Sequence, residues 1–95
     1  MYYRITKATV QSDKFEEAMS TMESLRESIG KINGLVSSNL IRITETEMLG
    51  VAAYESKEHL EASQKEFNEL MANMMPYMAV VPEVSYGEGV FSFNT

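Results

Sequence analysis

The segment YESKEHLEAS, residues 54–63, holds the only histidine of the chain. Its residue types suit acid–base chemistry on a phenol, because a neutral His59 can act as a base and either His59 or Tyr54 can assist deprotonation of the phenol. Ser56 is a good helix N-cap, so His59 can instead be an ordinary residue of a first helical turn. In that case it lies beside Leu60 at the edge of an apolar stripe and does no chemistry. The sequence leaves both interpretations open.

Four further polar side chains are candidates for a binding site. Ser38 and Asn39 interrupt an apolar segment, so each is hydrogen-bonded to its neighbours or faces a cavity. The ring of Tyr86 suits either the core or a ligand. Arg42 can bind an acidic ligand or pair with a nearby glutamate. The predicted catalytic residues are His59, Tyr54 and Asn39, and the predicted substrate-binding residues are Tyr86, Arg42 and Ser38.

Metal and phosphate sites find little support in the sequence. The chain has no cysteine, one histidine and no Asp-x-Asp pattern, so no zinc or calcium spacing occurs. The segment YGEGV is too short for a phosphate-binding glycine loop. Methionines are typical of an adaptable core or a pliable ligand surface, and copper binding through thioethers is a weaker alternative. The methionine cluster comprises Met19, Met22, Met71, Met74, Met75 and Met78.

Size and charge narrow the class of protein. A chain of 95 residues is expected to form one domain, 1–95, with a thin core and no disulfide to support it. The net charge of −6 argues against nucleic acid and anionic membrane partners. The start MYYRITKATV lacks the apolar core of a signal peptide, and no segment approaches about 20 apolar residues. These features predict a soluble cytoplasmic protein.

The order of elements predicts the fold. Strands are expected at 2–10, 35–44, 48–54 and 83–94, from their aromatic and β-branched residues. Apolar residues at spacings of three and four predict one helix that starts near Ser12 or Asp13 and reaches Ile32, and another from Ser56 to Pro76. The order β-α-β-β-α-β predicts an α+β, ferredoxin-like fold with a four-stranded antiparallel sheet and two helices on one face. Glycines at 87 and 89 suggest a bulge or the close approach of another backbone.

The strands carry apolar residues on both faces. Val51 and Leu49 alternate with Met48 and Ala52 in the third strand, although two helices cover only one face of such a sheet. A bare face of this composition exceeds the apolar patch that monomers usually expose. We therefore expect a homodimer that buries the two sheet faces against each other. The alternative is a monomer whose outer sheet face is apolar and exposed.

The chain resembles the dimeric α+β barrel superfamily and, within it, the antibiotic biosynthesis monooxygenase-like domains. The resemblance lies in the order of elements, in INGLVSSNLIR, and in AAYESKEHLEAS, where an aromatic residue ends the third strand and a helix start follows. It implies a paired-sheet dimer with a small cavity in each protomer between helices and sheet. It also implies chemistries that include cofactor-free oxidation of quinols, haem degradation and lactone isomerisation, and many members without known activity.

The departures from that pattern argue against haem degradation. Members that degrade haem carry a tryptophan where this chain has Tyr54, and a histidine near the position of Ser63. No tryptophan occurs anywhere, and His59 lies one helical turn too early. Two functions remain: a cofactor-free monooxygenase acting on a small phenol or quinol, and a non-catalytic homodimer that binds a small apolar or aromatic ligand or another protein.

Overall fold

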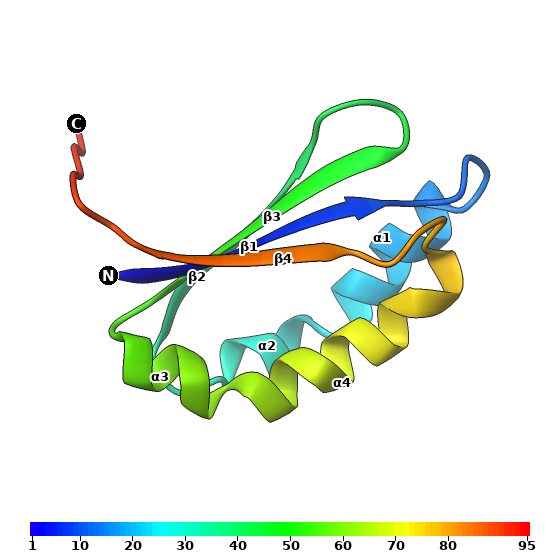
Figure 1. Cartoon of the computed structure of the whole chain (residues 1–95). Coiled ribbons are helices and arrows are strands. Elements are labelled where there is room, and N and C mark those ends of the chain that lie inside the picture. The colour runs from blue at the N-terminus through cyan, green and yellow to red at the C-terminus, as the bar shows by residue number, and fades with distance from the viewer.

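The computed structural model describes all 95 residues and contains one four-stranded antiparallel sheet with helices on one face (Figure 1). The spatial order of the strands is β2-β3-β1-β4. The strands are β1 Tyr2–Thr9, β2 Leu35–Arg42, β3 Glu47–Tyr54 and β4 Glu83–Glu88. The helices are α1 Phe15–Ser24, α2 Arg26–Gly30, α3 Lys57–Ala62 and α4 Gln64–Met74, followed by the 3-10 helix η1 Met75–Tyr77. The predicted ferredoxin-like fold is confirmed.

Each of the two predicted helices is divided by a single residue. Leu25 separates α1 from α2 and Ser63 separates α3 from α4, with ψ angles of −1° and 5°. Neither residue is glycine or proline, so the sequence carries no break signal at either point. Figure 1 shows that the chain changes direction between α3 and α4, and both helices lie on the same face of the sheet.

The helix boundaries test the predicted caps. Residue 14 occupies the N-cap position of α1 without a side-chain hydrogen bond, so the predicted capping by Ser12 or Asp13 is wrong. Ser56 does cap α3, because its hydroxyl accepts the His59 backbone N–H at 3.1 Å. α4 ends two residues before Pro76, as expected for a ring that cannot continue a helix.

The last strand is shorter than predicted. β4 ends at Glu88, which pairs with Tyr2, the first residue of its partner strand β1. Gly89 does approach another backbone, as one prediction required: its N–H donates to the Met1 carbonyl at 2.9 Å. A Cβ at Gly89 would lie 2.7 Å from the ring of Tyr3.

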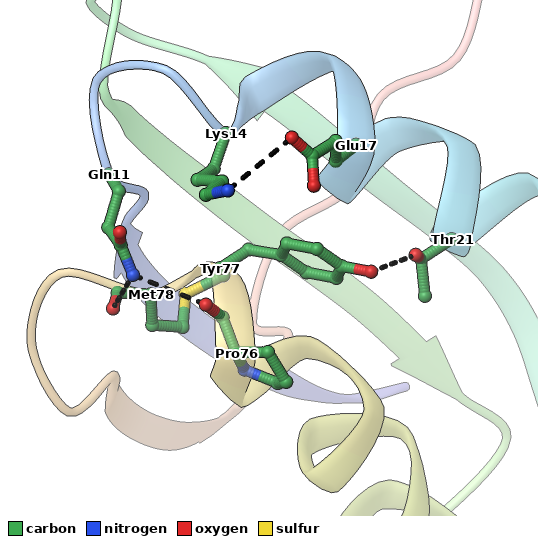
Figure 2. A network of polar contacts seen from close by, with 7 residues as sticks. All are labelled: Gln11, Lys14, Glu17, Thr21, Pro76, Tyr77 and Met78. Atoms are coloured by element: carbon green, nitrogen blue, oxygen red, sulfur yellow. Dashed lines mark hydrogen bonds and ion pairs between the residues drawn. The ribbon is translucent and has the colours of Figure 1, made fainter.

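The core occupies one end of the space between sheet and helices. It consists of Ala8, Val10, Ala18, Met48, Met74 and Met78. A polar network closes this end (Figure 2): Gln11 donates to the carbonyls of Pro76 and Met78 at 3.2 and 3.3 Å, and the hydroxyls of Thr21 and Tyr77 are 2.8 Å apart. η1 is thereby tied to α1 and to the end of β1. No helix has the length and hydropathy needed to cross a bilayer.

Strand register separates the two faces of the sheet. Arg4 pairs with Ala52 on one side and with Tyr86 on the other, and Ala52 pairs with Ser38, so these four residues form one row on the helix-covered face. The next row, on the opposite face, contains Ser85, Ile5, Val51 and Asn39. Apolar residues therefore lie on both faces, as predicted. Exposed ones on the uncovered face include Ile5, Ile41 and Ile43.

Candidate functional site

A cavity of about 110 Å³ lies between the covered face of the sheet and helices α1, α2 and α4. Its volume is several times the ~10–15 Å³ that one water needs, so it has room for a group the size of a small ring. It opens along β2, where Leu40 in its wall is 40 % exposed. The wall is mostly apolar and contains Met22, Met48, Met71, Met74 and Met78 together with Leu35, Phe67 and Leu70.

Arg4 forms the polar end of this cavity. It is 2 % exposed, although charged residues are almost never fully buried unless they are paired. Its Nη1 donates to the Tyr54 hydroxyl at 2.8 Å, and its Nη2 donates to Gln64 Oε1 at 3.3 Å and to the Leu60 carbonyl at 3.5 Å. The guanidinium also lies over the ring of Phe67, 4.0 Å from its centroid.

Two features of the chain explain this arrangement. Arg4 sits in β1 with the same parity as Ala8 and Val10, both buried, so its side chain must enter the covered face. The break at Ser63 brings the polar start of α4 over the sheet: the Ser63 hydroxyl donates to the Leu60 carbonyl at 2.7 Å, the same oxygen that accepts from Arg4. Two buried polar side chains thus converge on one carbonyl.

Three of the six predicted site residues lie on the helix-covered face beside Arg4. Tyr54 is 3 % exposed and its hydroxyl accepts from Arg4. Ser38 borders the cavity at the β2 end of the row. Tyr86 occupies the other end, half exposed, with its ring centroid 5.8 Å from the Arg4 guanidinium carbon. It faces an open depression shared with Tyr2.

His59 lies outside the cavity. Its Nδ1 is 2.7 Å from the Ser56 hydroxyl and its Nε2 is 3.6 Å from Glu55 Oε2, so both ring nitrogens face local partners at the helix start. Its ring covers Gly34 so closely that a Cβ there would lie 2.2 Å from His59 Cδ2. The arrangement fits the first-turn interpretation of His59, which is not among the residues that line the cavity.

Asn39 and Arg42 are also separated from Tyr54. Asn39 borders the cavity, but its pairing with Val51 places its side chain on the uncovered face, so only its backbone can face the cavity. Arg42 lies four residues along β2 from Ser38, about 13 Å at ~3.3 Å per residue. It donates to the Glu45 carbonyl at 2.9 Å and stacks on Phe15.

The position of His59 gives a first prediction. We expect His59→Ala to leave ligand binding in the cavity unchanged within about twofold and to cost less than about 1 kcal/mol of stability, because the Ser56 cap uses the backbone N–H and survives. Titration of a cavity ligand by calorimetry, with thermal melting in parallel, checks this. A tenfold loss of affinity in a folded variant would restore His59 to the site.

Sequence comparisons identify no relative: no family model and no curated protein matches the chain. Solved structures do match in fold. SnoaB, a cofactor-independent oxygenase from Streptomyces nogalater, is 11 % identical, with a TM-score of 0.82 over 99 % of this chain and 97 % of that one. A proposed antibiotic biosynthesis monooxygenase from Caulobacter crescentus is 22 % identical, with a TM-score of 0.80 over 95 % and 90 %. A Nitrosomonas europaea protein of unknown function is 10 % identical, with a TM-score of 0.83 over 99 % and 93 %.

These matches confirm the predicted resemblance at the level of fold. The chain has the ferredoxin-like α+β architecture of the antibiotic biosynthesis monooxygenase structures along nearly its whole length. One structure with this fold is described as an oxygenase and another has no known function, so the fold is compatible with more than one activity. The activity of this chain has to be argued from its own cavity.

Proposed function

We propose that the chain is a cofactor-independent, monooxygenase-like enzyme that oxidises a small phenolic or quinol substrate in the cavity. The observation that carries this proposal is an apolar cavity with one polar end, where the buried Tyr54 hydroxyl and Arg4 guanidinium meet. A phenolic ring suits the methionine-rich wall, and its oxygen suits the polar end. SnoaB, described as a cofactor-independent oxygenase, shares the fold.

The chemistry that we propose draws its electrons from the substrate. An electron-rich phenolate reduces oxygen: one oxygen atom forms a bond to a ring carbon whose C–H bond breaks, and the other leaves as water. The ring supplies all four electrons and ends as a quinone. Arg4 holds the negative charge of the substrate oxygen next to its guanidinium, where a low-dielectric site strengthens the attraction. The apolar wall keeps water away from the reduced oxygen species.

An alternative function is a binding module without turnover. Arg4 is already protonated, and the Tyr54 hydroxyl accepts its hydrogen bond from Arg4, so neither group is poised to take a proton from a neutral phenol. His59, the other predicted base, lies outside the cavity. This observation favours a protein that binds its ligand without activating it.

In either function we propose that the chain acts as a homodimer through the uncovered sheet faces. Ile5 is 37 % exposed in the central strand β1, and Ile41 and Ile43 at the edge are 45 % and 61 % exposed. These residues share one face by register, whereas the helices cover the other. A second copy with the same face supplies apolar cover without a new partner. A cytoplasmic location remains a prediction from the sequence.

Oxygen uptake tests the enzymatic proposal. With a panel of dihydroxyarenes we expect protein-dependent uptake that falls by about tenfold or more in Tyr54→Phe, because the polar end loses its hydroxyl. Tyr77→Phe is the matched control: it removes a hydroxyl bonded to Thr21 outside the cavity and should leave the rate unchanged. No uptake with any substrate, from a folded wild-type protein, would reject the enzyme in favour of the binding module.

A further inference from the structure

Arg4 is a buried cation without a counter-ion. No carboxylate lies within 4.0 Å of its guanidinium, although the chain carries 14 acidic residues, and the ion pairs that do form are at the surface or the helix start. Its Nε has no hydrogen-bond partner. Burial of an unpaired charge is costly, and a buried N–H without an acceptor adds to that cost.

Neutral groups around Arg4 offset only part of this cost. The rings of Phe67, Tyr54 and Tyr86 lie 4.0, 5.4 and 5.8 Å from the guanidinium carbon, which gives cation–π attraction. The hydrogen bonds to Gln64 and Leu60 are long, at 3.3 and 3.5 Å. None of these partners carries a negative charge. The polar end of the cavity therefore keeps a net positive charge.

We propose that the cavity binds a small aromatic acid in its ionised form, with the anionic oxygen paired to Arg4 and the ring among the methionines. The inference takes the location of the site from the proposed function, but it requires no turnover. It also explains why the cavity needs no base, because a ligand that arrives ionised has no proton for a group in the cavity to remove.

The shape and polarity of the cavity limit the anion. Fifteen of the 20 residues that line it are hydrophobic, and Arg4 is the only charged one among them. A strongly hydrated ion such as phosphate would lose its water there without enough donors to replace it. A flat apolar ring with one charged oxygen loses little hydration energy on entering the cavity, and its charge pairs with the single cation. Aryl carboxylates and acidic phenols share this chemistry.

Thermal melting of the whole chain with matched ligands tests the inference. The carboxylate arm compares benzoate with its neutral analogue benzamide, and the phenolate arm compares 4-nitrophenolate with nitrobenzene. At a concentration about 100 times Kd, an anion that binds only the folded state should raise Tm by on the order of 10 °C. The neutral analogues should shift it by a small fraction of that.

Two arginine variants provide the internal comparison. Arg4→Met removes the buried charge at similar length and should weaken anion binding by about 100-fold. Arg42→Met removes the same charge from an exposed arginine outside the cavity and should leave binding unchanged. If Arg4→Met does not fold, Arg4→Lys should bind at least about tenfold more weakly than wild type, since an ammonium lacks the planar fork.

Each outcome decides the inference. A shift with either anion that Arg4→Met or, in its place, Arg4→Lys reduces supports it, and the arm that responds identifies carboxylate or phenolate as the source. Equal shifts with anions and neutral analogues, or no shift with either anion, would overturn it. Binding without oxygen uptake would reject the enzymatic proposal alone, and oxygen uptake from neutral quinols without anion binding would reject this inference alone.

Discussion

Replacing Ile5 by glutamate is expected to weaken self-association of the chain by at least about 100-fold. Ile5 lies in the central strand β1 between Val51 and Ser85, so it is near the middle of the uncovered face. In a sheet-to-sheet dimer a carboxylate there is buried without a partner in each protomer, which costs about 3 kcal/mol or more. In the isolated chain the position is 37 % exposed and tolerates a charge.

Sedimentation equilibrium at micromolar concentration measures the effect. We expect the wild type to be a dimer and Ile5→Glu to be a folded monomer. Val81→Glu is the matched control, because Val81 is a 77 % exposed apolar residue in the loop before β4 and belongs to none of the strands. A monomeric wild type, or an Ile5→Glu variant that associates as tightly as wild type, contradicts the proposed dimer.

Replacing Gly34 by alanine is expected to destabilise the fold by about 3 kcal/mol. Gly34 has a φ of 80°, which costs an L-residue about 1 kcal/mol or more. The new Cβ would also lie 2.2 Å from Cδ2 and 2.6 Å from Cβ of His59, so the start of α3 must move. For a domain of this size we expect Tm to fall by on the order of 15 °C.

Gly30→Ala is the matched control for that variant. Gly30 is the last residue of α2, and a Cβ there meets nothing within 4 Å. Alanine loses less backbone freedom than glycine on folding, so this change should be neutral or stabilise by up to about 1 kcal/mol. If thermal melting finds the two variants equally stable, the packing of His59 over Gly34 is not as described.

The fold was predictable because its signals are local. Segments rich in aromatic and β-branched residues located every strand, apolar residues at spacings of three and four located both helical regions, and Pro76 and Ser56 marked real boundaries. The misplaced features depend on distant partners. The last strand ends at Glu88, which pairs with the first residue of β1, and no feature of the segment after Glu88 reveals this end. The break at Leu25 has no sequence signal that we can identify.

The candidate site was less predictable, because the face of the sheet to which a side chain points decides whether the residue reaches the cavity, more than its residue type does. Tyr54 and Ser38 lie at the cavity, but Asn39, one residue from Ser38, turns its side chain to the other face. His59 drew attention as the only histidine, yet its partners are the residues of its own helix start. Arg4 was not predicted. The sequence did carry a signal for it: Arg4 is a charged residue among the alternate positions of β1 whose side chains face the core.

The central claim is that the cavity with Arg4 at one end is the ligand site, and the methionine methyl groups can report on it directly. Met22, Met48, Met71, Met74 and Met78 line the cavity, whereas Met1, Met19 and Met75 do not. In titrations of the wild-type chain with benzoate and with 4-nitrophenolate, followed by NMR of methyl-labelled methionine, we predict that at least one of the two anions gives saturable shifts concentrated in the first group. Absent shifts with both anions, or shifts largest at Met1 and Met75, would contradict the claim.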